Sequence, residues 1–416
     1  MLVLIGIILV SLNLRVAVSS VSPIIAEISA DIPLDGVAVG ALGMLPPIGF
    51  AVGGLCAPAM SRRWGIELAT LFAALLLAAA LTARTFAPDL TGLFGSTAIA
   101  LVGAGIGNVL MPPAIKTFFP DRVGSVTGAY VATISVSAAL PAALSSPIAL
   151  TSHWRIAFAI WAIVAVCGVV PWIFIAHRNR HAVEQPSTGA AVRFRSIIHS
   201  RVAWALMIAH GTSSLHSYTV FAWLPVVLVD LSGATPIEAG VHLALYALIG
   251  LPAAVIAPAL MTRIARQDLV FYACSACYLI GYGGLLLVPS GPVLLWVIAF
   301  GTGSMLFTCV QTLIPLRTRD PRITTRVSGF SQGFGYVIAA AGPLLFGGLH
   351  EATNGWTVPL LFLIVTSAGG IVSGALLRRR DLVDDELGTR GGNGGQDAAP
   401  SSTAQRRPDR RGGQAT

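Results

Sequence analysis

The stretch Ala57-Pro58-Ala59-Met60-Ser61-Arg62-Arg63 recurs later in the chain as Ala257-Pro258-Ala259-Leu260-Met261-Thr262-Arg263. The same offset of about 200 residues relates Trp154 to Trp356. A constant offset over most of a half indicates two repeats with the same order of elements and the same orientation. The sequence therefore predicts a parallel duplication, about an axis along the membrane normal if the chain spans a membrane.

Long apolar runs dominate the sequence. Of its 416 residues 55% are hydrophobic and only 11% are charged, whereas soluble domains carry about 25% charged residues. A helix needs about 20 apolar residues to cross the hydrocarbon core. Twelve such runs can be read, which predicts an all-α membrane protein with twelve transmembrane helices: 2–27, 37–60, 67–86, 91–113, 125–150, 154–176, 202–229, 238–262, 268–288, 292–316, 325–349 and 356–377.

Basic residues occur in alternate loops, which predicts the orientation, because Lys and Arg concentrate on the cytoplasmic side. The opposite loops hold only Arg84 and Arg155, and they are acidic instead. Both termini are therefore expected in the cytoplasm. The basic set is Arg62, Arg63, Lys116, Arg122, Arg178, Arg180, Arg193, Arg195, Arg201, Arg263, Arg266, Arg317, Arg319, Arg322, Arg326, Arg378, Arg379 and Arg380.

The repeat and the spans predict four parts. These are an N-terminal six-helix bundle (1–176), a cytoplasmic linker (177–201), a C-terminal six-helix bundle (202–380) and a disordered cytoplasmic tail (381–416), which is polar and lacks periodicity. This arrangement is the major facilitator architecture, with its substrate site between the halves near the midplane. The first run is too long for a signal peptide, and its abrupt start at Met1 is compatible with a short cytoplasmic leader before it.

Arg15 is the first candidate for the substrate site. An ionisable group deep in a span costs at least about 2.5–3.5 kcal/mol, so it indicates function. It follows Asn13 in the middle of the first span, and no acid stands near it. A guanidinium facing a wet cavity would attract an anion or a strongly polar solute. The alternative is that Arg15 bonds helix carbonyls and packs the halves together.

Helix 7 repeats helix 1 and carries His210, His216, Tyr218 and Trp223. His216 falls close to the position that matches Arg15, and a histidine there could take up a proton. The alternative is a neutral imidazole bonded to a neighbouring helix. The remaining candidates for substrate binding are uncharged polar groups within spans, each of which could instead join helices: Asn108, Tyr130 and Gln311.

Charged residues in the cytoplasmic loops could gate the inner side by forming and breaking ion pairs. The alternative is that they are solvated charges that only set the orientation. The usual facilitator signature in the loop between helices 2 and 3, Gly-x-Leu-x-Asp-Arg-x-Gly-Arg-Arg, keeps Gly65 and one Arg here but lacks its Asp. The candidate gating residues are Arg62, Arg63, Lys116, Asp121 and Arg122.

Three segments resemble a known family. They are "NLR" (13–15) with "SPI" (22–24), "GNVLMPPAIKTFFPDRVGSVTGAY" (107–130), and "FAWLPVVLVD" (221–230) followed by "EAG". The chain resembles the cyanate/2-nitroimidazole transporter family of the major facilitator superfamily over most of its length. This resemblance implies the facilitator fold, the inner (plasma) membrane and a small polar or anionic solute.

The sequence thus predicts a secondary transporter of a small anionic or polar solute. Coupling of this transport to protons is a further hypothesis. The alternative is drug or metabolite efflux by the same fold. The expected partners are the solute and the lipid bilayer, and a monomer is expected. No catalytic residue, metal or cofactor is predicted, since Cys274-x-x-Cys277 lies in an apolar run without a second ligand pair. An enzyme or receptor lacks supporting motifs, and nucleic-acid binding lacks a basic aromatic face.

Overall fold

The computed structural model describes residues 2–178, 197–319 and 321–391, and within these ranges the regular structure is entirely helical. Twelve helical segments there are long and apolar enough to cross a membrane, from Leu2–Ser19 to Thr357–Leu377. Each coincides with one of the twelve predicted runs. The predicted fold class is confirmed.

The N-terminal half supplies six spans from a few long helices. One of them, α4, turns sharply at Gly65, whose φ of 81° lies in the left-handed region that glycine adopts at no steric cost, and so provides two spans. The helices are α1 (Leu2–Ser11), α2 (Val16–Ser19), η1 (Ser22–Ile24), α3 (Ile25–Asp31), α4 (Gly36–Thr85), α5 (Leu90–Phe118), η2 (Pro120–Arg122), α6 (Val123–Thr151) and α7 (Trp154–Arg178).

The C-terminal half repeats this order with more interrupted helices, since three of its spans are broken near their middles. These helices are α9 (Arg201–Ser232), α10 (Pro236–Leu248), α11 (Gly250–Arg263), α12 (Gln267–Leu287), α13 (Val293–Gly303), α14 (Met305–Leu316), α15 (Pro321–Thr353), α16 (Thr357–Thr366), α17 (Ala368–Leu377) and α18 (Val383–Gly391).

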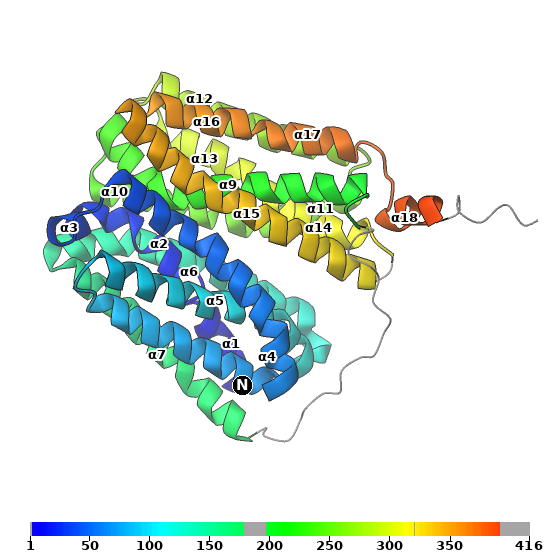
Figure 1. Ribbon diagram of the computed structural model, residues 1–416, viewed down its shortest axis with the longest axis horizontal. Helices are drawn as coiled ribbons and strands as arrows, with labels where there is room; N and C mark the ends of the chain where they lie inside the picture. The colour runs from blue at the N-terminus through cyan, green and yellow to red at the C-terminus, as the bar shows by residue number, and fades with distance from the viewer. Residues whose placement is uncertain (1, 179–196, 320, 392–416) are drawn as a thin grey trace, which may run out of the picture.

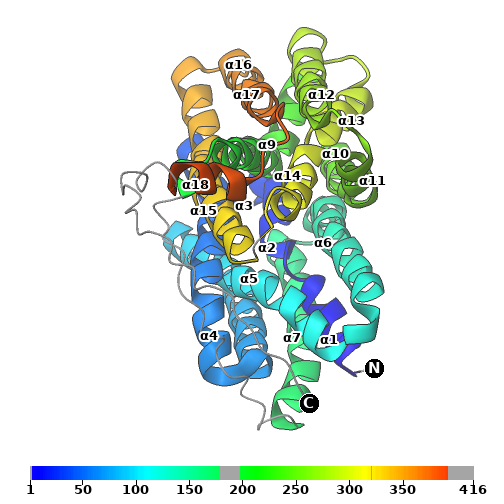
Figure 2. The ribbon, with the colours of Figure 1, turned by 90° about the vertical axis from the view of Figure 1, so that its right-hand side faces the viewer.

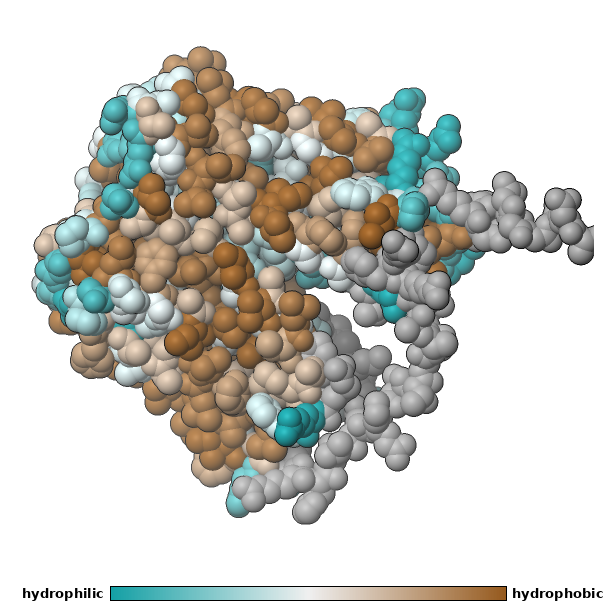
Figure 3. Space-filling model, viewed as in Figure 1, coloured by the Kyte–Doolittle hydropathy of each residue, from teal (hydrophilic) through white to brown (hydrophobic). Residues whose placement is uncertain are grey.

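The halves form two lobes that meet at one end of the molecule and diverge at the other (Figure 1), and seen from the diverging end the C-terminal lobe lies above the N-terminal one (Figure 2). We call the meeting end the acidic end, after Asp31, Asp35, Asp89, Asp230 and Glu351. The diverging end is the basic end, with Arg63, Arg178, Arg201, Arg263 and Arg317. Figure 3 shows an apolar surface between two polar ends, and it shows the molecule hollowed between the lobes on the basic side.

Glycines let the lobes approach closely at the acidic end. A Cβ atom on Gly40 of α4 would lie 2.8 Å from the carbonyl oxygen of Pro343 in α15. A Cβ atom on Gly240 of α10 would lie 2.6 Å from the carbonyl oxygen of Ala142 in α6. Glu351 also accepts a hydrogen bond from the backbone N–H of Val37 at 3.1 Å. The acidic end is therefore closed by backbone packed against backbone.

Two sequence predictions need correction. Residues from Asp381 were expected to be disordered, but Val383–Gly391 form α18, whose Glu386 accepts a hydrogen bond from Ser200 at the start of α9. Arg84 was expected in an outer loop, but it is fully buried. Its guanidinium bonds the Ala17 carbonyl and the Ser20 hydroxyl, because the interrupted first span leaves such groups without helical partners.

Candidate functional site

The first span is broken where Arg15 lies. The sequence predicted one continuous helix over 2–27, but α1 ends at Ser11 and α2 begins only at Val16. The break leaves the Arg15 backbone N–H without a helical acceptor, and it donates instead to the Ser137 hydroxyl of α6 at 2.9 Å. Irregular backbone at membrane depth is tolerated only where protein or a cavity surrounds it.

Three helix breaks meet at one cavity between the lobes. It measures about 180 Å³, and its wall includes Arg15 at the break of the first span, Gly250 at the start of α11 next to the break after α10, and Ser304 between α13 and α14. Discontinuous helices supply the binding groups of many transporters, because their free backbone ends and side chains point into the site. The convergence marks this cavity as the candidate site.

The Arg15 guanidinium has no counter-ion among the described residues. Its Nη1 atom donates to the Tyr218 hydroxyl across the lobes at a long 3.5 Å, and its carbon lies 4.7 Å from the centre of the Phe50 ring. None of the ion pairs formed by the described residues involves it. A half-buried cation that contacts only a phenol and a ring face keeps most of its capacity to bind an anion.

Hydroxyl groups make up the rest of the polar wall. The Tyr246 hydroxyl donates to Ser217 at 3.0 Å. Residues on one face of α9 recur at helical spacing along the cavity, at Ser214, Ser217, Tyr218 and Phe221. The further lining groups that carry hydroxyls are Ser135, Ser304, Thr308 and Tyr336. The cavity therefore offers one cation and several uncharged donors.

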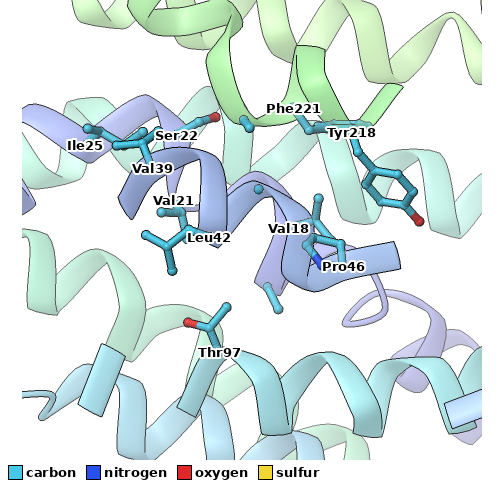
Figure 4. Close-up of a pocket in the computed structure, with 13 residues that line it drawn as sticks. Val18, Val21, Ser22, Ile25, Val39, Leu42, Pro46, Thr97, Tyr218 and Phe221 are labelled. Carbon is cyan, nitrogen blue, oxygen red and sulfur yellow. The ribbon is translucent and has the colours of Figure 1, made fainter. Parts of the chain in front are cut away.

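A second, smaller cavity of about 30 Å³ lies on the acidic side of the first. Figure 4 shows Val18, Leu42 and Thr97 around it. Tyr218 and Phe221 line both cavities, so these two side chains of α9 separate them. The path from the Arg15 cavity toward the acidic end thus passes Tyr218 and Phe221.

Only Arg15 and Tyr218 among the predicted substrate-binding residues line the larger cavity. Tyr130 and Asn108 bond each other within the N-terminal half, with the Tyr130 hydroxyl 3.2 Å from the Asn108 side-chain oxygen. The Asn13 amide donates to the carbonyl oxygens of Leu9 and Val164, which joins the first span to α7. These three residues lie within the lobe and outside the cavity wall.

The other predicted residues lie inside the C-terminal lobe. His216 is fully buried, with Nδ1 3.1 Å from the Tyr282 hydroxyl and its ring stacked on Tyr278. The Trp223 indole donates to the Pro343 carbonyl at 3.0 Å. Gln311 does not line the cavity. The structure therefore brings none of the three to Arg15, and the alternative interpretation of His216, an imidazole bonded to a neighbouring helix, matches its contacts.

The predicted gating residues lie at the basic end, where the lobes are apart. Arg63, Asp121 and Arg122 are exposed. Arg62 and Lys116 lie outside the residues whose side chains the structure describes. Nearby, Arg317 is buried and donates to the carbonyl oxygens of Leu377, Arg379 and Asp381. Burial lowers the pKa of Arg317, and the neighbouring Arg380 lowers it further.

Sequence reasoning missed the serine and threonine side of the cavity. Ser135, Ser214, Ser217, Ser304 and Thr308 are common residues in membrane helices, so each alone indicates nothing. Two signals were present: Ser214, Ser217 and Tyr218 share a helix face with Phe221, and Ser304 follows two glycines in a span. Spacing and small residues together could have predicted the face and the break.

Comparison with known proteins agrees with this architecture. A family model described as Major Facilitator Superfamily matches residues 3–336. The chain belongs to the major facilitator superfamily. This member is 32% identical over 364 residues to the 2-nitroimidazole transporter of Escherichia coli (strain K12), covering 87% of this chain and 91% of the relative. It is 26% identical over 367 residues to the cyanate transport protein CynX of the same organism, covering 86% and 92%.

A third relative is the transporter YycB of Bacillus subtilis (strain 168), which is 34% identical over 374 residues and is covered to 91%. Among solved structures, the facilitator fold is similar to the D-xylose-proton symporter, with a TM-score of 0.73, 13% identity, and coverage of 92% of this chain and 98% of that one. The nucleoside transporter NupG gives a TM-score of 0.74 at 11% identity, with coverage of 90% and 99%. The predicted family resemblance is confirmed, and the chain is a multi-pass membrane transporter by family.

Proposed function

We propose that this facilitator is a secondary active transporter of a small anion, which binds at Arg15 and crosses the membrane by alternating exposure of the cavity to its two ends. The observation that carries the proposal is the guanidinium of Arg15 in a cavity between the lobes, where its neighbours in the described part of the chain are a phenol and a ring face and include no carboxylate. A buried cation of this kind needs a partner, and a planar anion satisfies its fork geometry.

The size of the cavity and the relatives support a compact solute. A cavity of about 180 Å³ suits a molecule about the size of benzene, since a cavity of about 150 Å³ binds benzene. The relatives named for their solutes carry cyanate, which is a three-atom anion, and 2-nitroimidazole, which is a small polar heterocycle. We place a cyanate-like anion first and a small heterocycle second among the solutes of this chain.

We further propose that the chain resides in the plasma membrane with its basic end and both termini in the cytoplasm. The support is the distribution of Lys and Arg, which concentrates at the basic end. In that orientation the structure is open toward the cytoplasm. We also propose that the two lobes, over residues 1–176 and 202–380, act as the two moving bodies and that the protein functions as a monomer.

The test is solute counterflow in proteoliposomes, comparing cyanate, acetate, benzoate and 2-nitroimidazole. Replacing Arg15 by Gln removes the cation and keeps a polar side chain of similar length. A charge-assisted hydrogen bond contributes about 1.5–3 kcal/mol, so the half-saturation concentration for the anion should rise roughly 10- to 100-fold. Arg15→Lys keeps the charge, so the half-saturation concentration for the anion should rise less than in Arg15→Gln.

Asn13→Ala is the matched control, since Asn13 lies two residues away and faces α7. Transport of anions that is unchanged in a folded Arg15→Gln protein would refute the anion site. Efflux is the alternative: if inverted vesicles with an imposed pH gradient accumulate bulky apolar drugs and transport no small anion, the chain is an efflux pump.

A further inference from the structure

His210 is a buried imidazole without a hydrogen-bond partner. Its side chain is 0% exposed, and neither Nδ1 nor Nε2 finds a donor or acceptor among the described residues. Buried polar groups are nearly always bonded, and each exception needs an explanation. His216, two turns along the same helix, has partners within 3.5 Å at both ring nitrogens. Of these two histidines of α9, His210 is the one without partners among the described residues.

His210 belongs to the cavity face of α9. It precedes Ser214 by one helical turn on the face that continues through Ser217, Tyr218 and Phe221. Its ring lies 5.2 Å from the rings of Phe307 and Tyr336, both of which line the cavity. Since α9 begins at the basic end, His210 lies directly behind the cavity wall on the side from which the cavity opens.

The backbone makes room for this ring. A Cβ atom on Gly335 of α15 would lie 2.5 Å from Cδ2 of His210. Any other residue at that position would push the imidazole aside. The pocket around the ring is thus shaped by α9, α14 and α15 together, and a change in the angle between these helices would alter its exposure.

Few charges face this imidazole. The packed elements contribute Phe307 from α14 and Gly335 and Tyr336 from α15. Tyr336 is the titratable group among them, and Tyr218 stands two turns along on α9. Arg15 lines the same cavity as Tyr336 and is the cation among the residues of that wall. With no acceptor among the described residues, a protonated ring would be costly in this buried position.

We propose that His210 is the proton-binding residue of the transport cycle, taking up one proton when the cavity opens to the acidic end and releasing it at the basic end together with the anion. The inference rests on the proposed function. An imidazole nitrogen gains H⁺ on one side of the membrane and loses it on the other, so no oxidant or further reactant is needed.

Charge couples the two binding events. An anion bound at Arg15 would add negative charge to the cavity beside His210, so the occupied site should bind the proton more tightly. By linkage, a proton on His210 strengthens anion binding by the same factor. Because each ligand favours the other, both are bound in the same step and move in the same direction, which is symport.

The first experiment requires no solute. Spin labels at Thr91 and Thr353, which are exposed at the acidic ends of the two lobes, report the opening of that end in a cysteine-free background. As the pH falls from about 8 to about 4, across the range in which imidazole titrates, the wild-type distances should shift toward the open state. His210→Gln and His210→Asn should show no shift, and His216→Gln should retain it.

The second experiment measures coupling with cyanate as the probe. In proteoliposomes, a pH gradient should drive cyanate accumulation by the wild type but not by His210→Gln, while cyanate counterflow without a gradient is kept. A pH-dependent opening that persists in both His210 variants, or that disappears in His216→Gln instead, overturns the assignment. If the spin-label shift depends on His210 but cyanate is not moved, the proton site stands and the proposed anion is wrong.

Discussion

Arg15 and Arg84 show how the surroundings of a residue decide its use. Both are arginines of the N-terminal half without an ion pair among the described residues. Arg84 is fully enclosed, donates to Ala17 and Ser20, and lies 4.1 Å from the centre of the Phe158 ring. Arg15 is half-buried and faces a cavity. The first arginine stabilises a broken helix, and the second is available to a ligand.

Asp31 provides a pH-dependent contribution to stability at the acidic end. It accepts hydrogen bonds from the Trp154 indole at 2.9 Å and from Arg155 at 2.7 Å. The Trp154 bond first, and then the Arg155 bond, hold the pKa of this carboxyl below its ordinary value. The stabilisation is therefore present above the ordinary pKa of about 3.9 and is lost as the pH falls through the lowered one.

We expect Asp31→Asn to lower the melting temperature at neutral pH in detergent and to have no effect once the carboxyl is protonated in the wild type. Differential scanning fluorimetry over a pH series measures the difference. Asp121→Asn, which changes an exposed carboxylate at the opposite end, serves as the control. If the melting temperature of Asp31→Asn stays below that of the wild type by the same amount down to acid pH, the shape of the side chain and not its charge is responsible for the stabilisation.

Of the residues proposed from the sequence for the substrate site, Arg15 and Tyr218 line the cavity, and His216, Trp223 and Asn13 do not. An isolated arginine in a span indicates a functional site by itself, because a charged side chain within the membrane is energetically costly whichever way it faces. A histidine or tryptophan does not, since either can satisfy its polar atom on a neighbouring helix. Where such a side chain lies depends on its hydrogen-bond partner, such as Tyr282 for His216. The spacing of residues in the sequence does not reveal these partners.

The broken first span is the element that organises the site. A continuous helix would bond the Arg15 N–H internally and would leave the side chain at one fixed rotation. The interruption between Ser11 and Val16 transfers that N–H to Ser137 of α6. The bond across elements fixes the position of Arg15 relative to α6, which forms part of the same N-terminal wall of the cavity.

Ser137→Ala should therefore affect both stability and transport. The buried Arg15 N–H loses its acceptor, which costs about 1–3 kcal/mol, and the guanidinium loses its anchor, so the apparent anion affinity should fall. Thermal unfolding and counterflow kinetics measure the two effects. Ser146→Ala on the same helix is the control, because the Ser146 hydroxyl is buried without a partner among the described residues. Equal losses in the two variants would contradict the role of the bond.

The sequence predicted the spans accurately but not their rotations or interruptions. Length and hydropathy determine where a helix can cross, and each predicted run overlaps its observed span. In lipid, however, the outer face of a helix is as apolar as the inner face, so hydropathy does not indicate which side packs inward. The breaks at Arg15 and Ser304 depend on groups in other helices, such as Ser137. The hydropathy pattern along the sequence does not show these contacts between helices.

The whole molecule is closed at one end by helix crossings and open at the other. Gly40 and Gly43 of α4 pack against Pro343 of α15, and a Cβ atom added to Gly43 would lie only 2.6 Å from that of Ala222. The described part of the basic end has no comparable crossing, as Figure 1 shows. The balance between the two ends therefore depends on how well α4 and α15 fit together.

Gly40→Ala should shift this balance. The added methyl would lie 2.8 Å from the Pro343 carbonyl oxygen, which is too close for a real contact, so the acidic end should open more often. The spin-label pair at Thr91 and Thr353 should report a larger population at long distance. Gly348→Ala, where a Cβ meets open space, should leave the distances as in the wild type, and an unchanged distribution in Gly40→Ala would refute the crossing as the closure.

The crossing of α4 and α15 also decides whether water and protons can pass through the closed end. The backbones at Gly40 and Pro343 pack directly against each other, so no continuous chain of water molecules fits between them. Protons move through a membrane protein most readily along such a chain of water. The resting carrier should consequently be electrically silent: liposomes that contain it, with no solute present, should hold a membrane potential as long as empty ones do. A cell could then carry many idle copies of this protein without draining its ion gradients.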